Sequence, residues 1–319
     1  MKINSNITVG LAQISPVWLN KTKTLKKVAD WIDKASSRNC NLVVFGEALV
    51  PGYPFWIELT NSPEFNSSVQ KDLFGYYSRN AINIESGELD TICEFAKKKN
   101  IAVYLGIIER PTDRGGHSLY CSLVYINAEG QIKSVHRKLM PTYEERLVWS
   151  IGDGNGLRVH KLGKFTLGGL NCWENWMPLP RTALYGLGED LHVAVWPGSE
   201  HNTKDITRFV ARESRSFVIS VSALMNRSGI DSNIPHAELI LKNCPNQLTN
   251  GGSCIAGPDG EWIIEPVIDK EDLIIATLDQ NLIAKERQNF DPSGHYARPD
   301  VTKLTVDRKR QSTVDYLDN

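Results

Sequence analysis

The strongest constraint on the fold is the alternation of short apolar segments with amphipathic helical segments along most of the chain. Eleven segments are apolar and rich in β-branched residues, which is typical of buried strands. They span residues 7–14, 41–45, 102–108, 121–126, 132–136, 165–170, 192–196, 217–224, 253–256, 262–265 and 273–278. Helices are predicted at residues 22–35, 87–99, 180–186 and 204–216. This alternation predicts an α/β protein with covered sheets.

Two hairpin turns indicate that the sheets are mixed rather than purely parallel. Asn127-Ala-Glu-Gly130 joins two neighbouring strand segments, and Gly257-Pro-Asp-Gly260 joins two more. Eleven strands are also many for one open sheet in a chain of 319 residues. We therefore expect two packed sheets with helices outside both of them.

Composition and charge argue against several classes of function. The 36 Lys and Arg residues balance 37 Asp and Glu residues, so the chain lacks the basic footprint of a nucleic-acid-binding protein. No stretch approaches the ~18 consecutive apolar residues of a membrane-spanning helix. Residues 1–15 lack the apolar segment of a secretory signal. Six scattered cysteines without a CxxC pair are typical of a reducing compartment, so we expect a cytoplasmic protein.

The strongest local signal for chemistry is a cysteine at the end of a strand. Residues 167–180 read Leu-Gly-Gly-Leu-Asn-Cys-Trp-Glu-Asn-Trp-Met-Pro-Leu-Pro, which places Cys172 between an apolar strand and a helix start. Backbone N–H groups and the positive end of a helix favour the thiolate that a nucleophile needs. The alternative is that Cys172 is one more small buried hydrophobic residue. This segment alone leaves both interpretations open.

Two further strand ends carry a charged residue. An apolar strand runs into Glu47, and burying a carboxylate is unfavourable unless it is paired or works as an acid or base. Another strand leads to Lys138, ahead of Glu144 and Glu145. A lysine beside carboxylates stays cationic and can stabilise negative charge. Each segment also fits a solvated, non-functional charge, and spacing does not choose between Glu144 and Glu145.

Other motifs point to no metal site and no nucleotide site. Gly152-Asp-Gly-Asn-Gly156 imitates part of a dinucleotide-binding fingerprint but lacks the third spaced glycine and follows no clear strand. The sequence contains no Walker motif, no G-x-S-x-G and no H-E-x-x-H. The seven histidines are dispersed, so a metal site is not expected.

Taken together, the three strand-end segments resemble the nitrilase branch of the carbon–nitrogen hydrolase superfamily. The branch carries a Glu after the second strand, a Lys in R-K-L-x-P-T-x-x-E-R and a Cys in C-W-E-N-x-x-P-L, and Glu47, Lys138 and Cys172 match these positions. Further matches are Trp149-Ser-Ile-Gly-Asp-Gly154, residues 196–198 and residues 291–300, so the likeness covers about residues 6–302. Gly46 departs from the Pro that many members carry there, which leaves the chemistry untouched.

For the architecture, the resemblance implies a four-layer α-β-β-α sandwich with two mixed sheets. Residues 1–290 would form the nitrilase-like domain, and residues 291–319 would form a C-terminal segment. The charged sequence of that segment leaves two roles open, oligomerisation or a disordered tail. The family resemblance further implies a homodimer as the building block of a larger homo-oligomer or spiral.

For the chemistry, the resemblance implies that Glu47, Lys138 and Cys172 converge in one pocket and that Glu145 is the second family glutamate. Cys172 would attack the carbon of a small-molecule nitrile, and the thioimidate and thioester that follow would give a carboxylic acid and ammonia without a cofactor. The alternatives are an amidase or a cyanide hydratase on the same residues. A non-catalytic metabolite-binding protein with the same fold is the rival from another class.

Four residues beside the catalytic segments are candidates for substrate binding. They are Tyr53, Thr142, Trp173 and Trp196. An aromatic wall suits an apolar substituent, so we expect an aliphatic or arylaliphatic nitrile.

Overall fold

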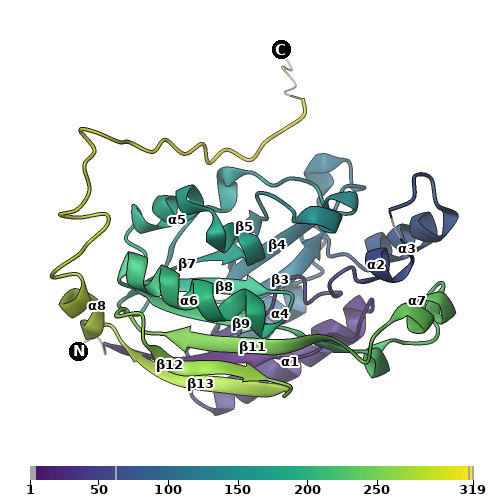
Figure 1. The fold of residues 1–319 in the computed structure, drawn as a ribbon, viewed down its shortest axis with the longest axis horizontal. Helices are drawn as coiled ribbons and strands as arrows, with labels where there is room; N and C mark the ends of the chain where they lie inside the picture. Colours follow the sequence, from purple (N-terminus) through teal and green to yellow (C-terminus); the bar gives the residue numbers. More distant parts are fainter. Residues whose placement is uncertain (1–4, 62, 315–316, 318–319) are drawn as a thin grey trace.

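A computed structural model describes residues 5–61, 63–314 and 317. It forms two sheets that pack face to face, with helices on both outer faces (Figure 1). The predicted four-layer sandwich of two mixed sheets is therefore confirmed. The ends of the predicted ranges 1–290 and 291–319, at residues 1–4, 315–316 and 318–319, lie outside the described residues.

The first sheet has the strand order β13-β1-β2-β3-β4-β5. Neighbours β1, β2 and β3 run parallel, and the remaining neighbours in the sheet pair antiparallel. The strands are β1 (Asn6–Gln13), β2 (Leu42–Phe45), β3 (Ala102–Glu109), β4 (Tyr120–Ile126), β5 (Ile132–Arg137) and β13 (Asp272–Asp279).

The second sheet has the order β10-β11-β9-β8-β7-β6, with β12 paired to β11. Its centre, β7, β8 and β9, is parallel, and its other pairs are antiparallel. The strands are β6 (His160–Leu162), β7 (Phe165–Asn171), β8 (Leu191–Trp196), β9 (Phe217–Ser222), β10 (Leu224–Asn226), β11 (Gln247–Ala256) and β12 (Trp262–Ile268).

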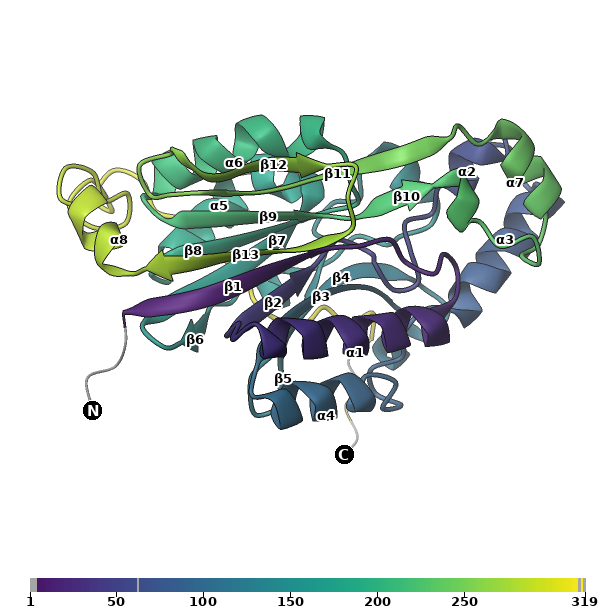
Figure 2. The same ribbon diagram turned by 90° about the horizontal axis from the view of Figure 1, so that it is seen from below.

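Helices cover the outer face of each sheet, as Figure 2 shows. The helices α1 (Lys21–Ser37) and α4 (Asp90–Lys99) lie outside the first sheet, and α5 (Pro178–Tyr185) and α6 (Glu200–Ser214) lie outside the second. These four helices were predicted, with ends that differ by a few residues. The unpredicted helices are α2 (Trp56–Leu59), α3 (Ser68–Arg79), α7 (Ala237–Asn243) and α8 (Asn281–Glu286).

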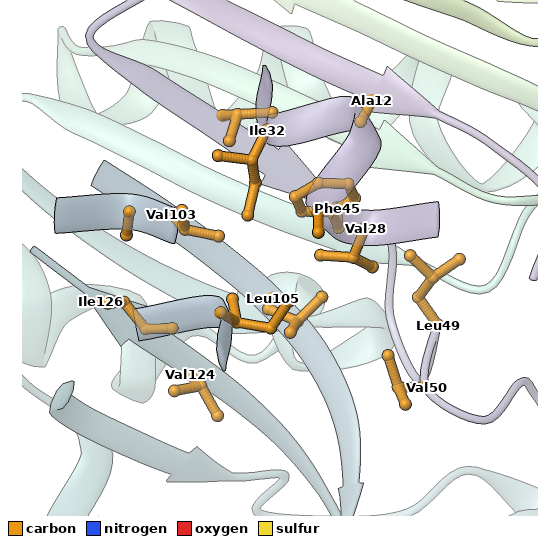
Figure 3. Close-up of a cluster of buried hydrophobic side chains, with 14 of the residues drawn as sticks. Ala12, Val28, Ile32, Phe45, Leu49, Val50, Val103, Leu105, Val124 and Ile126 are labelled. Atoms are coloured by element: carbon orange, nitrogen blue, oxygen red, sulfur yellow. The ribbon is translucent and has the colours of Figure 1, made fainter. Parts of the chain in front are cut away.

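Each layer boundary is an apolar core. The face of α1 that carries Val28 and Ile32 packs on Phe45, Val103 and Leu105 of the first sheet (Figure 3). A second cluster fills the space between the sheets. Asn20 caps the start of α1 by accepting a hydrogen bond from the backbone N–H of Lys23 at 3.0 Å. Burial on both faces explains why the strands read as continuous apolar runs.

All eleven predicted strand segments are strands, and one of them is divided. The segment 217–224 forms β9 and β10, which pair with different parts of β11. The division falls at Ala223, whose backbone lies against Gly46, so that a Cβ on Gly46 would stand 3.0 Å from the Ala223 nitrogen. Among the helices in the described part of the chain, none has the length and apolarity needed to cross a membrane.

The chain after α8 is extended and runs along the outside of the molecule past α5 (Figure 1). Its described residues touch the domain near Asp153, which accepts hydrogen bonds from the Arg310 side chain at 3.0 Å and from the Gln311 backbone at 3.1 Å. Arg310 also donates to the Val135 carbonyl at 3.0 Å.

The close crossing at Gly106 in β3 provides a test of the packing. A Cβ on Gly106 would lie 2.1 Å from the Gly46 carbonyl oxygen and 2.8 Å from the Glu47 Cα. Because that contact is with backbone, Gly106→Ala should lower the free energy of unfolding by about 1–3 kcal/mol, measured by chemical denaturation. Gly75→Ala in α3 is the control, since its Cβ would meet an Arg79 side-chain atom at an ordinary contact distance of 3.5 Å. A Gly106→Ala midpoint equal to that of the control would contradict the described crossing.

Candidate active site

The three predicted residues follow strands that end at the same edge of the sandwich. Glu47 follows β2, Lys138 follows β5, and Cys172 follows β7. The backbone N–H of Glu47 donates to the Trp196 carbonyl at the end of β8 at 3.1 Å, which ties the first sheet to the second at this edge. All three side chains are buried, with exposed fractions of 1%, 0% and 3%.

Lys138 is the centre of the cluster. Its ammonium lies 2.8 Å from Glu47 Oε1 and 2.7 Å from Glu145 Oε2. A carboxylate oxygen of Glu47, one of Glu145 and the Cys172 Sγ all lie within 4.8 Å of one another. The ring of Trp149 stands 5.4 Å from the Lys138 nitrogen. Glu47, Lys138 and Cys172 therefore lie together in one buried cluster.

The choice between Glu144 and Glu145, which spacing left open, is decided by the turn that follows Lys138. A 3₁₀ helix begins at Tyr143, and its first turn directs Glu145 inward, where its carboxylate accepts from the Thr142 backbone at 2.6 Å. Glu144 contacts the hydroxyl of Tyr53 at 2.8 Å instead of the Lys138 ammonium. The inward carboxylate matches the glutamate that the family resemblance selected.

Two carboxylates and one ammonium in a dry site leave an excess of negative charge. Burial raises the pKa of the Glu47 carboxyl to about 7, and the attraction of Lys138 offsets that rise only in part. Burial opposes the charge on Lys138, but Cys172, Glu47 and Glu145 together raise the pKa of its ammonium well above the ordinary value. Glu47 is therefore suited to exchange a proton near neutral pH, whereas Lys138 stays charged.

Cys172 has a left-handed backbone with φ 48° at the start of a 3₁₀ helix. A backbone N–H lowers the pKa of the thiol, as the sequence predicts. The backbone N–H of Trp173 hydrogen-bonds to the Cys172 sulfur and has this effect. Burial and the Glu47 carboxylate outweigh it and raise the pKa of the thiol well above its ordinary value. The Cys172 thiol therefore needs a neighbouring base during attack. The Glu47 Oε2 atom has no hydrogen-bond partner among the described residues.

Glu174 is a buried carboxylate that sequence reasoning passed over. It accepts hydrogen bonds from the backbone N–H of Leu139, next to Lys138, and of Asn171, next to Cys172, the latter at 2.8 Å. His136 Nε2 lies 3.0 Å from the same carboxylate. Burial acts the other way, but these partners hold the pKa of Glu174 below its ordinary value. The spacing of Asn171 and Glu174 is that of a capping box, which is the signal that could have found it.

The four predicted substrate-binding residues lie in different surroundings. The Tyr53 hydroxyl donates to Glu144 and Glu145, and Thr142 caps the turn that carries Glu145. The side chain of Trp173 is exposed at the surface. Trp196 is fully buried, and its indole N–H donates to Ser220 Oγ at 3.2 Å. Tyr53 and Thr142 thus adjoin the charged cluster directly, whereas Trp196 contributes its backbone carbonyl.

The same acidic and sulfur atoms are the group best placed to bind a cation among the described residues. The Lys138 ammonium already lies between the two carboxylates, at 2.8 and 2.7 Å. The Lys138 ammonium, held by the two carboxylates, therefore supplies the positive charge at this site.

Comparison with known proteins identifies the family of this chain. The family model described as carbon–nitrogen hydrolase matches residues 8–288. The chain belongs to the carbon–nitrogen hydrolase family. Nitrilase 2 from an unknown prokaryotic organism is 35% identical over 98% of this chain and 96% of its own length. An aliphatic nitrilase of Rhodococcus rhodochrous is 31% identical over 99% of this chain and 86% of its own. These full-length relatives place the chain in the nitrilase branch, as the sequence motifs predicted.

Solved structures of the family share the fold. The NitFhit protein of C. elegans superposes with a TM-score of 0.70 at 16% sequence identity, covering 97% of this chain and 69% of that one. The likeness shows the sandwich fold, and the family match assigns the chain to hydrolases that act on carbon–nitrogen bonds.

The Glu174 contacts predict a strong effect of a small change. Glu174→Gln should lower ammonia release about 10²-fold, because an amide nitrogen facing backbone N–H groups lets the Lys138 and Cys172 loops move apart. Initial rates and circular dichroism measure the effect and the fold. The exposed Glu261, which pairs with Arg208 at 3.1 Å, gives the matched control Glu261→Gln with unchanged rates. Equal rates in the two variants would remove Glu174 from the site.

Proposed function

We propose that this carbon–nitrogen hydrolase converts an organic nitrile to the carboxylic acid and ammonia, with Cys172 as nucleophile, Glu47 as base, Lys138 as electrostatic stabiliser and Glu145 as the group that holds Lys138. The observation that carries the proposal is the buried cluster itself. A thiol, an ammonium and a carboxyl with a pKa of about 7 adjoin one another in a chain similar to nitrilases over its whole length.

The first step forms a carbon–sulfur bond. Glu47 takes the proton of the Cys172 thiol as the sulfur attacks the nitrile carbon, and the proton passes to the nitrile nitrogen. The product is a thioimidate, R–C(=NH)–S–Cys172. A base with a pKa near 7 suits this transfer because it accepts and returns a proton at similar free energy.

The second step adds water and releases nitrogen. Glu47 takes a proton from a water molecule whose oxygen adds to the thioimidate carbon, and nitrogen receives protons until it leaves as ammonia. A second water then cleaves the thioester, which gives the carboxylic acid and restores the thiol. Lys138 stabilises the negative charge on the tetrahedral species, and such a charge contact is strongest in a water-poor site.

Glu145 holds the Lys138 ammonium in place from one catalytic cycle to the next. Its carboxylate accepts from Lys138, from the Thr142 backbone and from the Tyr53 hydroxyl. Three donors satisfy the Glu145 carboxylate, so Glu145 accepts a further proton less readily than Glu47, whose Oε2 has no such partner among the described residues. This difference supports the assignment of the base to Glu47.

We further propose an aliphatic or arylaliphatic nitrile as substrate, with Tyr53, Thr142, Trp173 and Trp196 around the bound molecule. The name of the Rhodococcus relative, an aliphatic nitrilase, supports this choice. Six free cysteines support a reducing, cytoplasmic location. We propose that residues 1–290 are the catalytic domain and that residues 291–319 help to join homodimers into a larger assembly.

The raised pKa of Glu47 predicts the pH profile. Below about pH 7 the carboxyl is protonated and cannot accept the thiol proton, so kcat/KM should rise with pH and level off above that value. Lys138→Met removes the cation that lowers the pKa of Glu47, so the rising limb of its residual activity should move to higher pH. The measurement is ammonia release against pH; a profile of the variant that moves to lower pH would exclude Glu47 as the base.

Removal of the nucleophile gives the direct test of the function. Cys172→Ala should abolish ammonia release from a panel of aliphatic and arylaliphatic nitriles while circular dichroism stays unchanged, because the alanine keeps the Cβ and the thiol is small. Cys93→Ala in α4, away from the cluster, is the matched control and should keep full activity. Ammonia production by Cys172→Ala would contradict the assigned role.

Product analysis separates the proposal from its alternatives. We expect acid and ammonia from nitriles, measured by chromatography on nitrile, amide and cyanide panels. Turnover of amides alone would indicate an amidase, formamide from cyanide would indicate a cyanide hydratase, and no turnover on any panel would favour a binding protein.

A further inference from the structure

A second series of buried polar side chains is hydrogen-bonded to the backbone of Cys172, and the reaction steps above do not use these side chains. It consists of Glu189, which precedes β8, His192 within β8, and Asn175 in the 3₁₀ helix after Cys172. Their exposed fractions are 0%, 0% and 1%. These three side chains are as deeply buried as the Glu47 cluster. They lie at the second sheet rather than between the Lys138 and Cys172 loops.

The hydrogen bonds form an unbroken series that ends on the nucleophile residue. The Asn175 side-chain nitrogen donates to the Cys172 carbonyl at 2.7 Å. The Asn175 side-chain oxygen lies 2.7 Å from His192 Nε2. His192 Nδ1 lies 3.0 Å from both carboxylate oxygens of Glu189.

The direction of these bonds follows from donor chemistry. The Cys172 carbonyl can only accept, so the side-chain nitrogen of Asn175 faces it and the side-chain oxygen faces His192. That oxygen also accepts, which requires a proton on Nε2. His192 Nε2 therefore donates to Asn175, and a hydrogen bond joins Nδ1 to the Glu189 carboxyl group.

The end point of the series is the residue with the unusual backbone. Cys172 has φ 48°, a left-handed conformation that is unfavourable for a residue with a Cβ. The same conformation turns the Trp173 N–H toward the Cys172 sulfur. A donor on the Cys172 carbonyl fixes the peptide plane that carries this N–H, and the hydrogen bond from His192 to the Asn175 side-chain oxygen makes the amide nitrogen a stronger donor.

We propose that Glu189, His192 and Asn175 form a positioning relay that holds the Cys172–Trp173 peptide, and with it the sulfur, in the geometry of attack. None of the three touches the reacting atoms, so they are positioning residues. The inference deepens the proposed function, since it rests on Cys172 as the nucleophile. Arg181, which donates to the Asn175 backbone carbonyl at 2.7 Å, supports the same segment from α5.

The test uses the rate of alkylation of Cys172 by iodoacetamide, followed by peptide mass spectrometry, together with kcat and KM on nitriles. Asn175→Asp keeps the shape but removes the donor to the Cys172 carbonyl, and it should lower both the alkylation rate and kcat about 10²-fold with little change in KM. Glu189→Gln should lower them about tenfold through His192.

A neighbouring carboxylate gives the matched control. Asp190 is buried beside Glu189 but accepts from the Thr166 backbone at 2.7 Å instead of from His192. Asp190→Asn should lower stability and leave the alkylation rate and kcat unchanged. If Asp190→Asn lowered the alkylation rate as much as Glu189→Gln does, the contact of Glu189 with His192 would be merely structural, and the relay would be overturned.

Two further measurements decide the remaining cases. In a double-mutant cycle, Glu189→Gln should have little effect in the Asn175→Asp background, whereas additive effects would overturn a path through Asn175. If a variant does not fold, ¹⁵N spectra of the wild-type histidines decide, since the relay requires a proton on Nε2 of His192 and an unprotonated Nε2 excludes it. Alkylation and spectra need no nitrile, so a failure of the relay is distinguishable from a failure of nitrile hydrolysis.

Discussion

The ammonium of Lys138, held between Glu47 and Glu145 without water, is the interaction on which the site depends. Taking three charged groups out of water is unfavourable by several kcal/mol for each ion, and close contacts at 2.8 and 2.7 Å recover part of it. Burial, helped by the negative charge of Glu145, outweighs the attraction of Lys138 and raises the pKa of Glu47 to about 7.

The sandwich supplies the rigidity that this arrangement needs. Glu47 and Cys172 stand one or two positions beyond strands that are buried on both faces, so their backbone cannot shift without disturbing the apolar cores. Buried carboxylates then join the loops to one another. Glu174 connects the Lys138 loop to the Cys172 loop, and Glu189 acts through His192 and Asn175 on the far side of the proposed nucleophile.

Much of the fold could be predicted from the chain because a strand buried on both faces leaves a continuous apolar run. β2 and β8 are clear for this reason. The helices α3 and α7 escaped prediction because they bury few side chains; α3, for example, buries only Leu73 and Tyr77. The helix α2 and the strand β6 escaped because they have only four and three residues. The candidate residues Glu47, Lys138 and Cys172 were predicted because charge or sulfur directly after an apolar strand is conspicuous, whereas Glu174 and His192 stand inside segments that already had an explanation.

The sequence by itself determined the two mixed sheets, the covering helices and the membership of the nitrilase branch, since apolar periodicity and motif order are properties of the chain alone. Only the tertiary structure decided that burial and Glu47 raise the pKa of the Cys172 thiol, that Glu174 joins the Lys138 and Cys172 loops, and that His192 lies behind Cys172. The physical reason is that side-chain direction and pKa depend on dehydration and on charges brought close by other strands, and neither is encoded in the spacing of residues along the chain.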